Sequence, residues 1–194
     1  MKIDNMTSSL RSSSRALLVA SQVALCLGAA STFGCSASAE IPEVVVTQSD
    51  IEFVGVPRIP GITDTSMMIS TSFDHPKGFE LPEFMNPELR PMAASIAGRG
   101  SMEDLSFLEG VTLTLSSRAP DAPPPMVVAS YERHAGNVGR TVRLDTATQS
   151  DVIEYWSTKD AYYDVQLWGM LPESDWAIDV TVSFSGELSV SSSD

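Results

Sequence analysis

Hydrophobic and polar residues alternate with a period of two over much of the second half of the chain. In the segment GVTLTLSS, Val111, Leu113 and Leu115 share one phase and the residues between them are threonines. The longest run is WAIDVTVSFSGELSV, residues 176–190, where apolar residues occupy every second position from Ile178 to Phe184 and, after Gly186, again at Leu188 and Val190. A strand with one face in a core and the other in water has this pattern. These segments therefore predict antiparallel β-strands.

Strands are predicted in eight segments, each bounded by turn-forming residues: 44–47, 51–56, 67–73, 111–115, 126–131, 142–144, 165–167 and 178–190. Many short strands with turn signals between them are typical of a β-sandwich. Two short helices are also predicted. In 82–98, Asn86-Pro87 could begin a helix that ends near Gly98, and in 150–157 Ser150 caps a connecting helix.

The order of the segments DLSFLEGVTLTLSS, LDTATQSDVIEYW, YDVQLWGMLP and WAIDVTVSFSGEL resembles that of immunoglobulin-like modules in exported proteins of Gram-negative bacteria. The resemblance covers roughly residues 43–190 and is one of pattern, without the Cys and Trp signature of antibody domains. It implies an all-β, immunoglobulin-like antiparallel sandwich with one or two short helices, at the cell surface or in the periplasm. We expect one domain over 43–190 and a frayed tail at 191–194.

The first residues have the composition of an export signal. Three basic residues, Lys2, Arg11 and Arg15, precede the apolar segment ALLVASQVALCLGAA at 16–30. That segment has the length of a signal-peptide core and is shorter than a membrane span. We therefore expect the chain to be exported.

Two processing sites compete in the residues that follow. Ala37-Ser38-Ala39 is a signal-peptidase site that would make 1–39 the signal peptide. Alternatively, Thr32-Phe33-Gly34-Cys35 partly resembles a bacterial lipobox, so that 1–34 would be removed and Cys35 would carry a lipid. The first predicts a periplasmic or secreted protein and the second an outer-membrane lipoprotein. Either way, the mature chain has no pair of cysteines for a disulfide.

Charge excludes some classes of partner. The chain has 194 residues, 43% hydrophobic and 19% charged, with 12 Lys+Arg against 25 Asp+Glu. Removal of 1–39 would take away three basic residues and Asp4, so that 9 basic and 24 acidic residues remain, a net charge of -15. Nucleic-acid binding needs clustered basic residues, so no nucleic acid is expected. Membrane contact is expected only through a lipid on Cys35.

Candidate catalytic and metal-ligating residues are few. His75 and His134 are the two histidines, and both are predicted to be solvated loop residues. Neither they nor the cysteines have the spacing of a zinc site. Four aspartates, at 145, 151, 160 and 164, could supply oxygens to calcium, but we expect them to cap and to turn. No catalytic residue, metal ligand or cofactor is assigned.

Aromatic residues concentrate in one part of the chain, since all three tryptophans and three of the four tyrosines fall within 155–176. Large rings fill sandwich cores, and they also stack on sugar rings or anchor protein partners. Trp168 is out of phase with Val165 and Leu167, which indicates that it points away from their face. The candidate ligand-binding residues are therefore Tyr162, Tyr163, Trp168 and Trp176.

These observations predict a non-catalytic exported envelope protein, a lipid-anchored interaction or structural β-sandwich with an unknown envelope protein or glycan as partner. The alternative is a carbohydrate- or ligand-binding module that uses the aromatic residues, with or without calcium. A hydrolase built on acids and a histidine is a third, weaker hypothesis.

Overall fold

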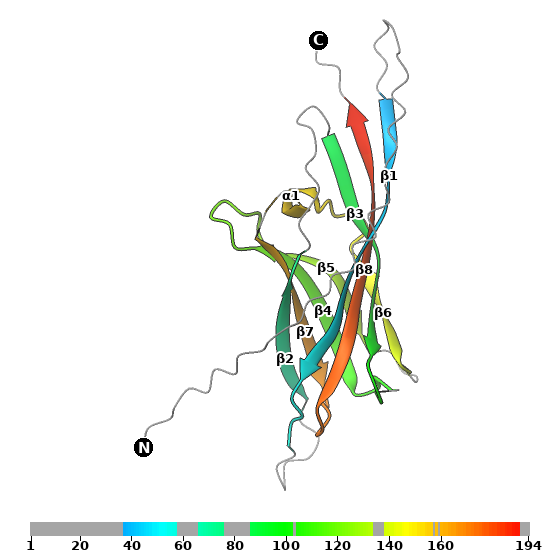
Figure 1. Cartoon of the computed structure of the whole chain (residues 1–194), viewed down its shortest axis with the longest axis vertical. Coiled ribbons are helices and arrows are strands. Elements are labelled where there is room, and N and C mark those ends of the chain that lie inside the picture. The colour runs from blue at the N-terminus through cyan, green and yellow to red at the C-terminus, as the bar shows by residue number, and fades with distance from the viewer. Residues whose placement is uncertain are drawn as a thin grey trace, which may run out of the picture.

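The computed structural model describes residues 37–57, 66–75, 86–102, 104–133, 138–156, 158 and 160–190. The described residues form eight strands and one short helix (Figure 1). In chain order these are β1 (Ala37–Phe53), β2 (Met67–Asp74), β3 (Asn86–Gly98), β4 (Leu108–Ser117), β5 (Met126–Glu132), β6 (Thr141–Thr146), α1 (Ile153–Trp156), β7 (Ala161–Gly169) and β8 (Trp176–Val190). No helix in these ranges is long and apolar enough to cross a membrane.

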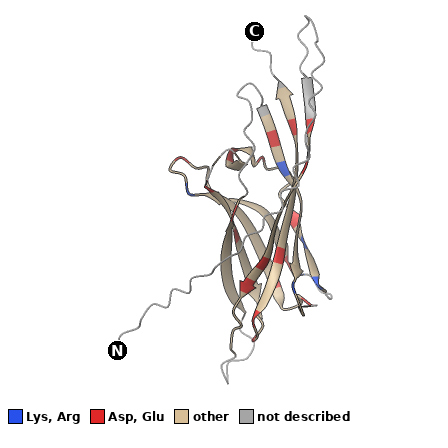
Figure 2. Ribbon diagram, viewed as in Figure 1, with Lys and Arg blue, Asp and Glu red and all other residues tan. Residues whose placement is uncertain are grey.

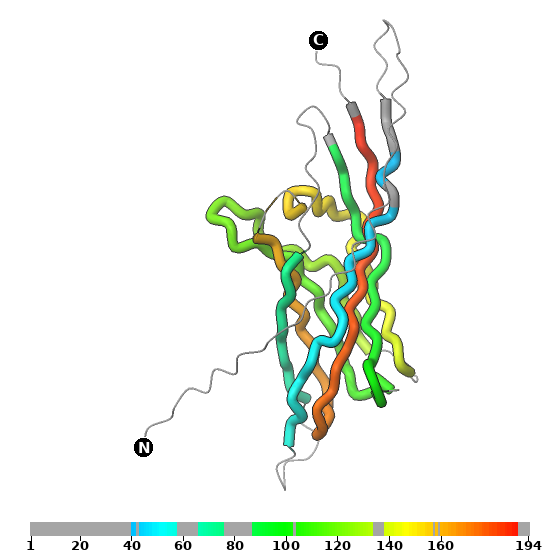
Figure 3. Tube along the Cα trace, viewed as in Figure 1, coloured from blue at the N-terminus to red at the C-terminus, as the bar shows by residue number. Residues whose placement is uncertain are grey.

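All eight strands belong to one curled antiparallel sheet in the order β1-β8-β3-β6-β5-β4-β7-β2. The sheet has two halves, which we name after their central strands: the β8 half (β1, β8, β3, β6) and the β7 half (β2, β7, β4, β5). They are joined by two residue pairs between β5 and β6, Ala129↔Thr146 and Ser130↔Asp145. The tube view shows how the sheet curls at this junction (Figure 3). The prediction of antiparallel β structure is confirmed.

Strand pairing is nested: β1 pairs with β8, β2 with β7, β3 with β6 and β4 with β5. In immunoglobulin domains, by contrast, the first strand lies beside the second, and the third, sixth and seventh strands form the opposite sheet. Here the first strand lies beside the last. The strand order therefore differs from the immunoglobulin-like order that the sequence pattern implied.

The core is a single cluster of apolar side chains from both halves of the sheet. Strand β7 alternates between buried and half-buried residues along its whole length, and Val165 and Leu167 are fully buried. On β8, Ile178, Val180 and Val182 are fully buried in the phase predicted from the sequence. The period-two pattern therefore identified the inward faces of both central strands.

The helix predicted within 82–98 is wrong, because residues Asn86–Gly98 form strand β3. β3 is paired with β8 along its length but with β6 only from Ala94 to Ala97. Pro91 lies in the part that has β8 as its one strand neighbour, beside a register shift, and proline is tolerated at such an edge or bulge. Pairing with β8 thus overrides the helix-starting signal of Asn86-Pro87.

The predicted helix at 150–157 exists in shortened form as α1. Its cap is Asp151 and not the predicted Ser150: Asp151 Oδ1 accepts hydrogen bonds from the backbone N–H groups of Ile153 and Leu89. The Val152 N–H in turn donates to the Leu89 carbonyl. This connection therefore satisfies backbone groups on the free edge of β3, which would otherwise be open to another strand.

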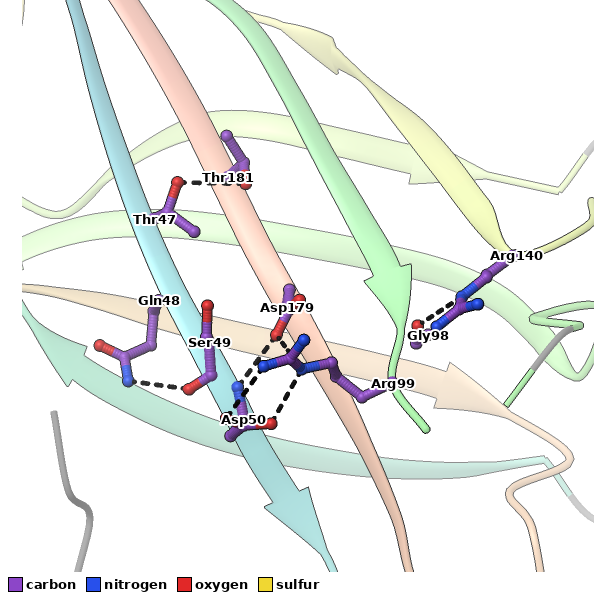
Figure 4. Close-up of polar contacts among 9 residues, drawn as sticks. All are labelled: Thr47, Gln48, Ser49, Asp50, Gly98, Arg99, Arg140, Asp179 and Thr181. Carbon is purple, nitrogen blue, oxygen red and sulfur yellow. Dashed lines mark hydrogen bonds and ion pairs between the residues drawn. The ribbon is translucent and has the colours of Figure 1, made fainter. Parts of the chain in front are cut away.

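At the opposite end of the β8 half, an ionic cluster joins three segments (Figure 4). Arg99 Nε lies 2.9 Å from Asp50 Oδ1 and 3.2 Å from Asp179 Oδ1. Asp50 has a φ of 56° at a β1 register shift, and its N–H donates to Asp179 Oδ1. The contacts with Arg99 lower the pKa of Asp50. The cluster fixes an irregular stretch of an edge strand.

Strands β1, β8 and β3 extend past the other strands at one end of the molecule (Figure 1). Acidic residues mark all three in this extension (Figure 2). Glu187 on β8 lies directly opposite Glu40 on β1 and Glu88 on β3, so three carboxylates share one row. Arg90 contacts Glu88 at 2.8 Å.

Candidate ligand-binding surface

Strand β7 presents a row of four side chains on the outer face of the β7 half. Tyr162, Asp164, Gln166 and Trp168 are half-buried, whereas the residues between them are buried. The alternation of a strand places them all on one face. The predicted outward orientation of Trp168 is confirmed.

Trp168 lies over the neighbouring strand β4. Gly110 is its register partner, and a Cβ built on Gly110 would overlap three atoms of the Trp168 ring. The indole therefore occupies the space that any larger residue at 110 would need. The side chain remains partly exposed, so the ring is held against β4 and still open to contact from solvent.

The middle of the face is lined by hydroxyl and amide groups. Gln166 is opposite Thr112 on β4 and Ser70 on β2, and Asp164 is opposite Thr114 and Ser72. Directly opposite residues on adjacent strands lie on the same face with Cβ atoms roughly 5 Å apart. These groups therefore form two polar rows across three strands.

The far end of the row is an aromatic–cation pair. The Arg118 guanidinium lies 4.4 Å from the centre of the Tyr162 ring, within the range of a cation–π contact. Arg118 Nη1 is also 3.3 Å from Asp74 Oδ1. Trp168 lies six residue positions after Tyr162, so the two residues are about 20 Å apart along β7.

Two of the four aromatic residues predicted as ligand contacts lie elsewhere. Tyr163 is 0% exposed and stacks on Phe73, and Trp176 is 5% exposed between Phe53 and Phe107. Both belong to the core, which corrects the expectation of an exposed patch containing them. Cys35, the predicted lipidation site, lies outside the described residues.

His75 is buried, which corrects the prediction of a solvated loop residue. It is 8% exposed, its Nδ1 lies 3.1 Å from the Tyr163 hydroxyl, and its ring meets Trp156 edge-on. Burial lowers its pKa to about 4 and raises the pKa of the Tyr163 hydroxyl. The lowered value has desolvation as its cause, with no carboxylate contributing. His134 lies outside the described residues.

The aspartates that were candidates for calcium binding lie in different parts of the structure and have different roles. Asp151 caps α1, Asp164 accepts a hydrogen bond from Gln166 Nε2 at 3.5 Å, and Asp145 pairs with Ser130 at the junction of the two halves. Across the described ranges, no three His, Cys, Asp or Glu residues are grouped closely enough to hold a metal ion.

A shallow hollow of about 670 Å³ lies on the outer face of the β8 half. Small side chains line much of it, including Ala93, Ser95 and Ser183, and Glu43 and Arg143 also take part. Val45 and Met92 are the exposed apolar members, at 48% and 52%. This surface carries none of the predicted ligand contacts.

A scan against protein-family models and a search of the curated proteins find no match to this chain. The chemistry of the surfaces themselves therefore provides the evidence for function. Of the residues on the outer face of the β7 half, the sequence pattern identified Tyr162 and Trp168 but not Gly110 on β4 or Arg118, which follows β4. Periodicity indicates that Gly110 and Thr112 share a face, but not that this face adjoins β7.

Proposed function

We propose that this protein is a non-catalytic binding protein of the bacterial cell envelope, built as a β-sandwich and held at the outer membrane by a lipid on Cys35. The observation that carries the proposal is the outer face of the β7 half, where two half-exposed rings flank rows of hydroxyl, amide and carboxylate groups. Such a face offers stacking and hydrogen-bonding groups to a ligand. His75, a candidate base, lies in the core and contacts aromatic rings.

We further propose that the curled sheet is a sandwich of the jelly-roll type. The support is the nested pairing of first with last, second with seventh, third with sixth and fourth with fifth strand. Folding a long double strand over on itself produces this order, and jelly rolls occur in capsid and lectin domains and in cupins. A fold of this kind serves many functions, so the binding role is argued from the surface and not from the topology.

The position of β1 supports lipidation over cleavage after Ala39. Backbone pairing of β1 with β8 begins at Ala37↔Val190 and continues through Ala39↔Leu188. Cleavage after Ala39 would remove three paired residues from the edge strand. Cleavage before Cys35 leaves β1 whole, with a short connection to the lipid.

Fractionation of cells that produce the full-length protein tests the envelope assignment. We expect the mature protein in the outer-membrane fraction, with a mass increased by a diacylglycerol-modified cysteine. Cys35→Ala should abolish the modification and the membrane association, and Cys26→Ala is the matched control that should leave both unchanged. A soluble wild-type protein with an N-terminus at Glu40 would contradict the lipid anchor.

A carbohydrate-binding module is the form of this function that the surface favours. The specific observation is the partly exposed Trp168 ring held against Gly110. An aromatic ring fixed on a flat polar face can stack against the apolar face of a sugar while neighbouring groups bind its hydroxyls. Whether calcium assists ligand binding is tested separately, by measuring binding with and without a chelator.

A further inference from the structure

We propose that the outer face of the β7 half binds a neutral, linear polysaccharide that runs along β7, with one sugar ring stacked on Trp168. This inference rests on the proposed binding function and specifies its ligand. It is carried by three observations: how Trp168 is held, which groups follow it along the strand, and the charge of the face.

The first observation is the fixed platform. Because the indole of Trp168 fills the space above Gly110 on the adjacent strand, its position is set by the sheet. On the other side, its register partner on β2 is Met68, which is 67% exposed. The C–H groups of a pyranose ring are attracted to the negative face of an aromatic ring. A preorganised ring loses little side-chain entropy when a ligand binds.

The second observation is the direction of the polar groups. Beyond Trp168, the pairs formed by Gln166 with Thr112 and by Asp164 with Thr114 follow in order along β7. Their amide, carboxylate and hydroxyl groups match the donors and acceptors of successive sugars. The row ends about 20 Å from Trp168 at Tyr162, whose ring contacts Arg118. This length suits a chain of several sugars better than a single residue.

The third observation is charge. Asp164 on β7 and Asp74 on β2 share this face, and the cation at its far end, Arg118, is engaged by Asp74 and Tyr162. The chain as a whole carries a net charge of -13. A polyanion would be repelled by this surface, whereas a neutral polysaccharide would not.

Affinity electrophoresis of the purified protein tests the inference, with a neutral β-glucan, an α-glucan, a mannan and a xylan each cast into native gels, and dextran sulfate as the anionic probe. We expect at least one neutral polysaccharide to retard the protein and dextran sulfate not to. Retardation should persist in EDTA. Trp168→Ala should weaken it by about tenfold or more, the loss expected when one stacked ring is removed.

Three further variants separate loss of the platform from loss of folding. Trp168→Phe keeps an aromatic face and should retain most of the binding, whereas Gly110→Ala keeps the indole but displaces it and should weaken binding. Met92→Ala, an exposed apolar residue in the hollow of the β8 half, is the matched control and should bind normally. Circular dichroism and thermal melting show that each variant is folded.

Several results would overturn the inference. They are retardation by none of the neutral polysaccharides, retardation by dextran sulfate alone, or binding that survives Trp168→Ala. A protein partner that crosslinks to this face while every polysaccharide fails would make the face a protein interface. In each case the assignment to the cell envelope would be tested independently, by the fractionation experiment.

Discussion

At the scale of single residues, the buried imidazole of His75 makes the stability of the fold depend on pH. Its Nδ1 faces the Tyr163 hydroxyl, and Nε2 has no hydrogen-bond partner within the described ranges. Burial lowers the pKa of His75 from 6.5 to about 4 in the folded state. The unfolded chain therefore binds the proton first as the pH falls, and protonation favours unfolding.

We expect the free energy of unfolding to be nearly constant above pH 7 and to fall by about 2 kcal/mol between pH 7 and pH 5 through His75 alone. Urea unfolding at several pH values measures this. In His75→Gln, which retains a polar side chain but does not titrate, most of that fall should disappear. Parallel pH profiles for the two proteins would show that His75 is not the source.

The period-two pattern predicts which face of a strand a residue lies on, but not which other segments of the chain it contacts. The phase of Trp168 against Val165 and Leu167 predicted its outward orientation correctly, because one strand fixes which residues share a face. Phase also separates Tyr162 from Tyr163, its buried neighbour. Trp176 has the same phase as the buried Ile178 and Val180, so periodicity also indicates its burial. The burial of His75 involves contacts with Tyr163 and Trp156, which belong to other segments of the chain. The sequence does not indicate such contacts.

At the scale of elements, the extension formed by β1, β8 and β3 contains a repulsive row. Glu187 has Glu40 on one side and Glu88 on the other, and like charges at directly opposite positions destabilise a sheet. Glu187→Gln should therefore stabilise the protein by about 0.5 kcal/mol. Thermal unfolding at low ionic strength, where screening is weakest, measures the gain.

Glu52→Gln is the matched control for this row. Glu52, like Glu187, is exposed and lies in the β1–β8 pair, but its register partner on β8 is Ala177. The control should leave the melting temperature nearly unchanged. Equal increases in the melting temperature of the two variants would show that the effect comes from the total charge of the protein and not from the row of glutamates.

Elements differ in how well the sequence predicts them. Strands β4 and β8 were predicted well because their alternation is long and regular. A helix was predicted in place of β3 because Asn86-Pro87 is a helix-starting signal, and the segment is a strand because β8 pairs with it. The predicted strands at 44–47 and 51–56 are largely one strand, β1, interrupted by the register shift near Asp50. Pairing across the sheet decided each of these outcomes.

At the scale of the whole molecule, self-repulsion opposes compactness, since acidic residues outnumber basic ones by 25 to 12. We expect the melting temperature at pH 7 to rise when NaCl is increased from 20 to 500 mM, because salt screens exposed charges. Near pH 4, where about half of the carboxylates are protonated, the rise should be much smaller. A salt response of equal size at both pH values would contradict this explanation.

The overall topology is the feature least accessible from the sequence. Eight alternating segments are compatible with many strand orders, and the sequence pattern implied an immunoglobulin-like one. The nested order depends on which strands pair, and the pairing partners are far apart in the chain: Thr47 and Thr181, whose hydroxyls are 3.3 Å apart, are 134 residues distant in sequence.

That separation governs the time course of folding. A contact between distant parts of a chain is slow to form, because a long loop must close before the contact stabilises anything. Of the eight described strands, the edge strand β1 leaves the ribosome first and its partner β8 leaves last. Until residues 176–190 are available, β1 has no strand to pair with. A polypeptide with this pairing keeps an open β1 edge until β8 has been synthesised, and an open strand edge can pair with another chain.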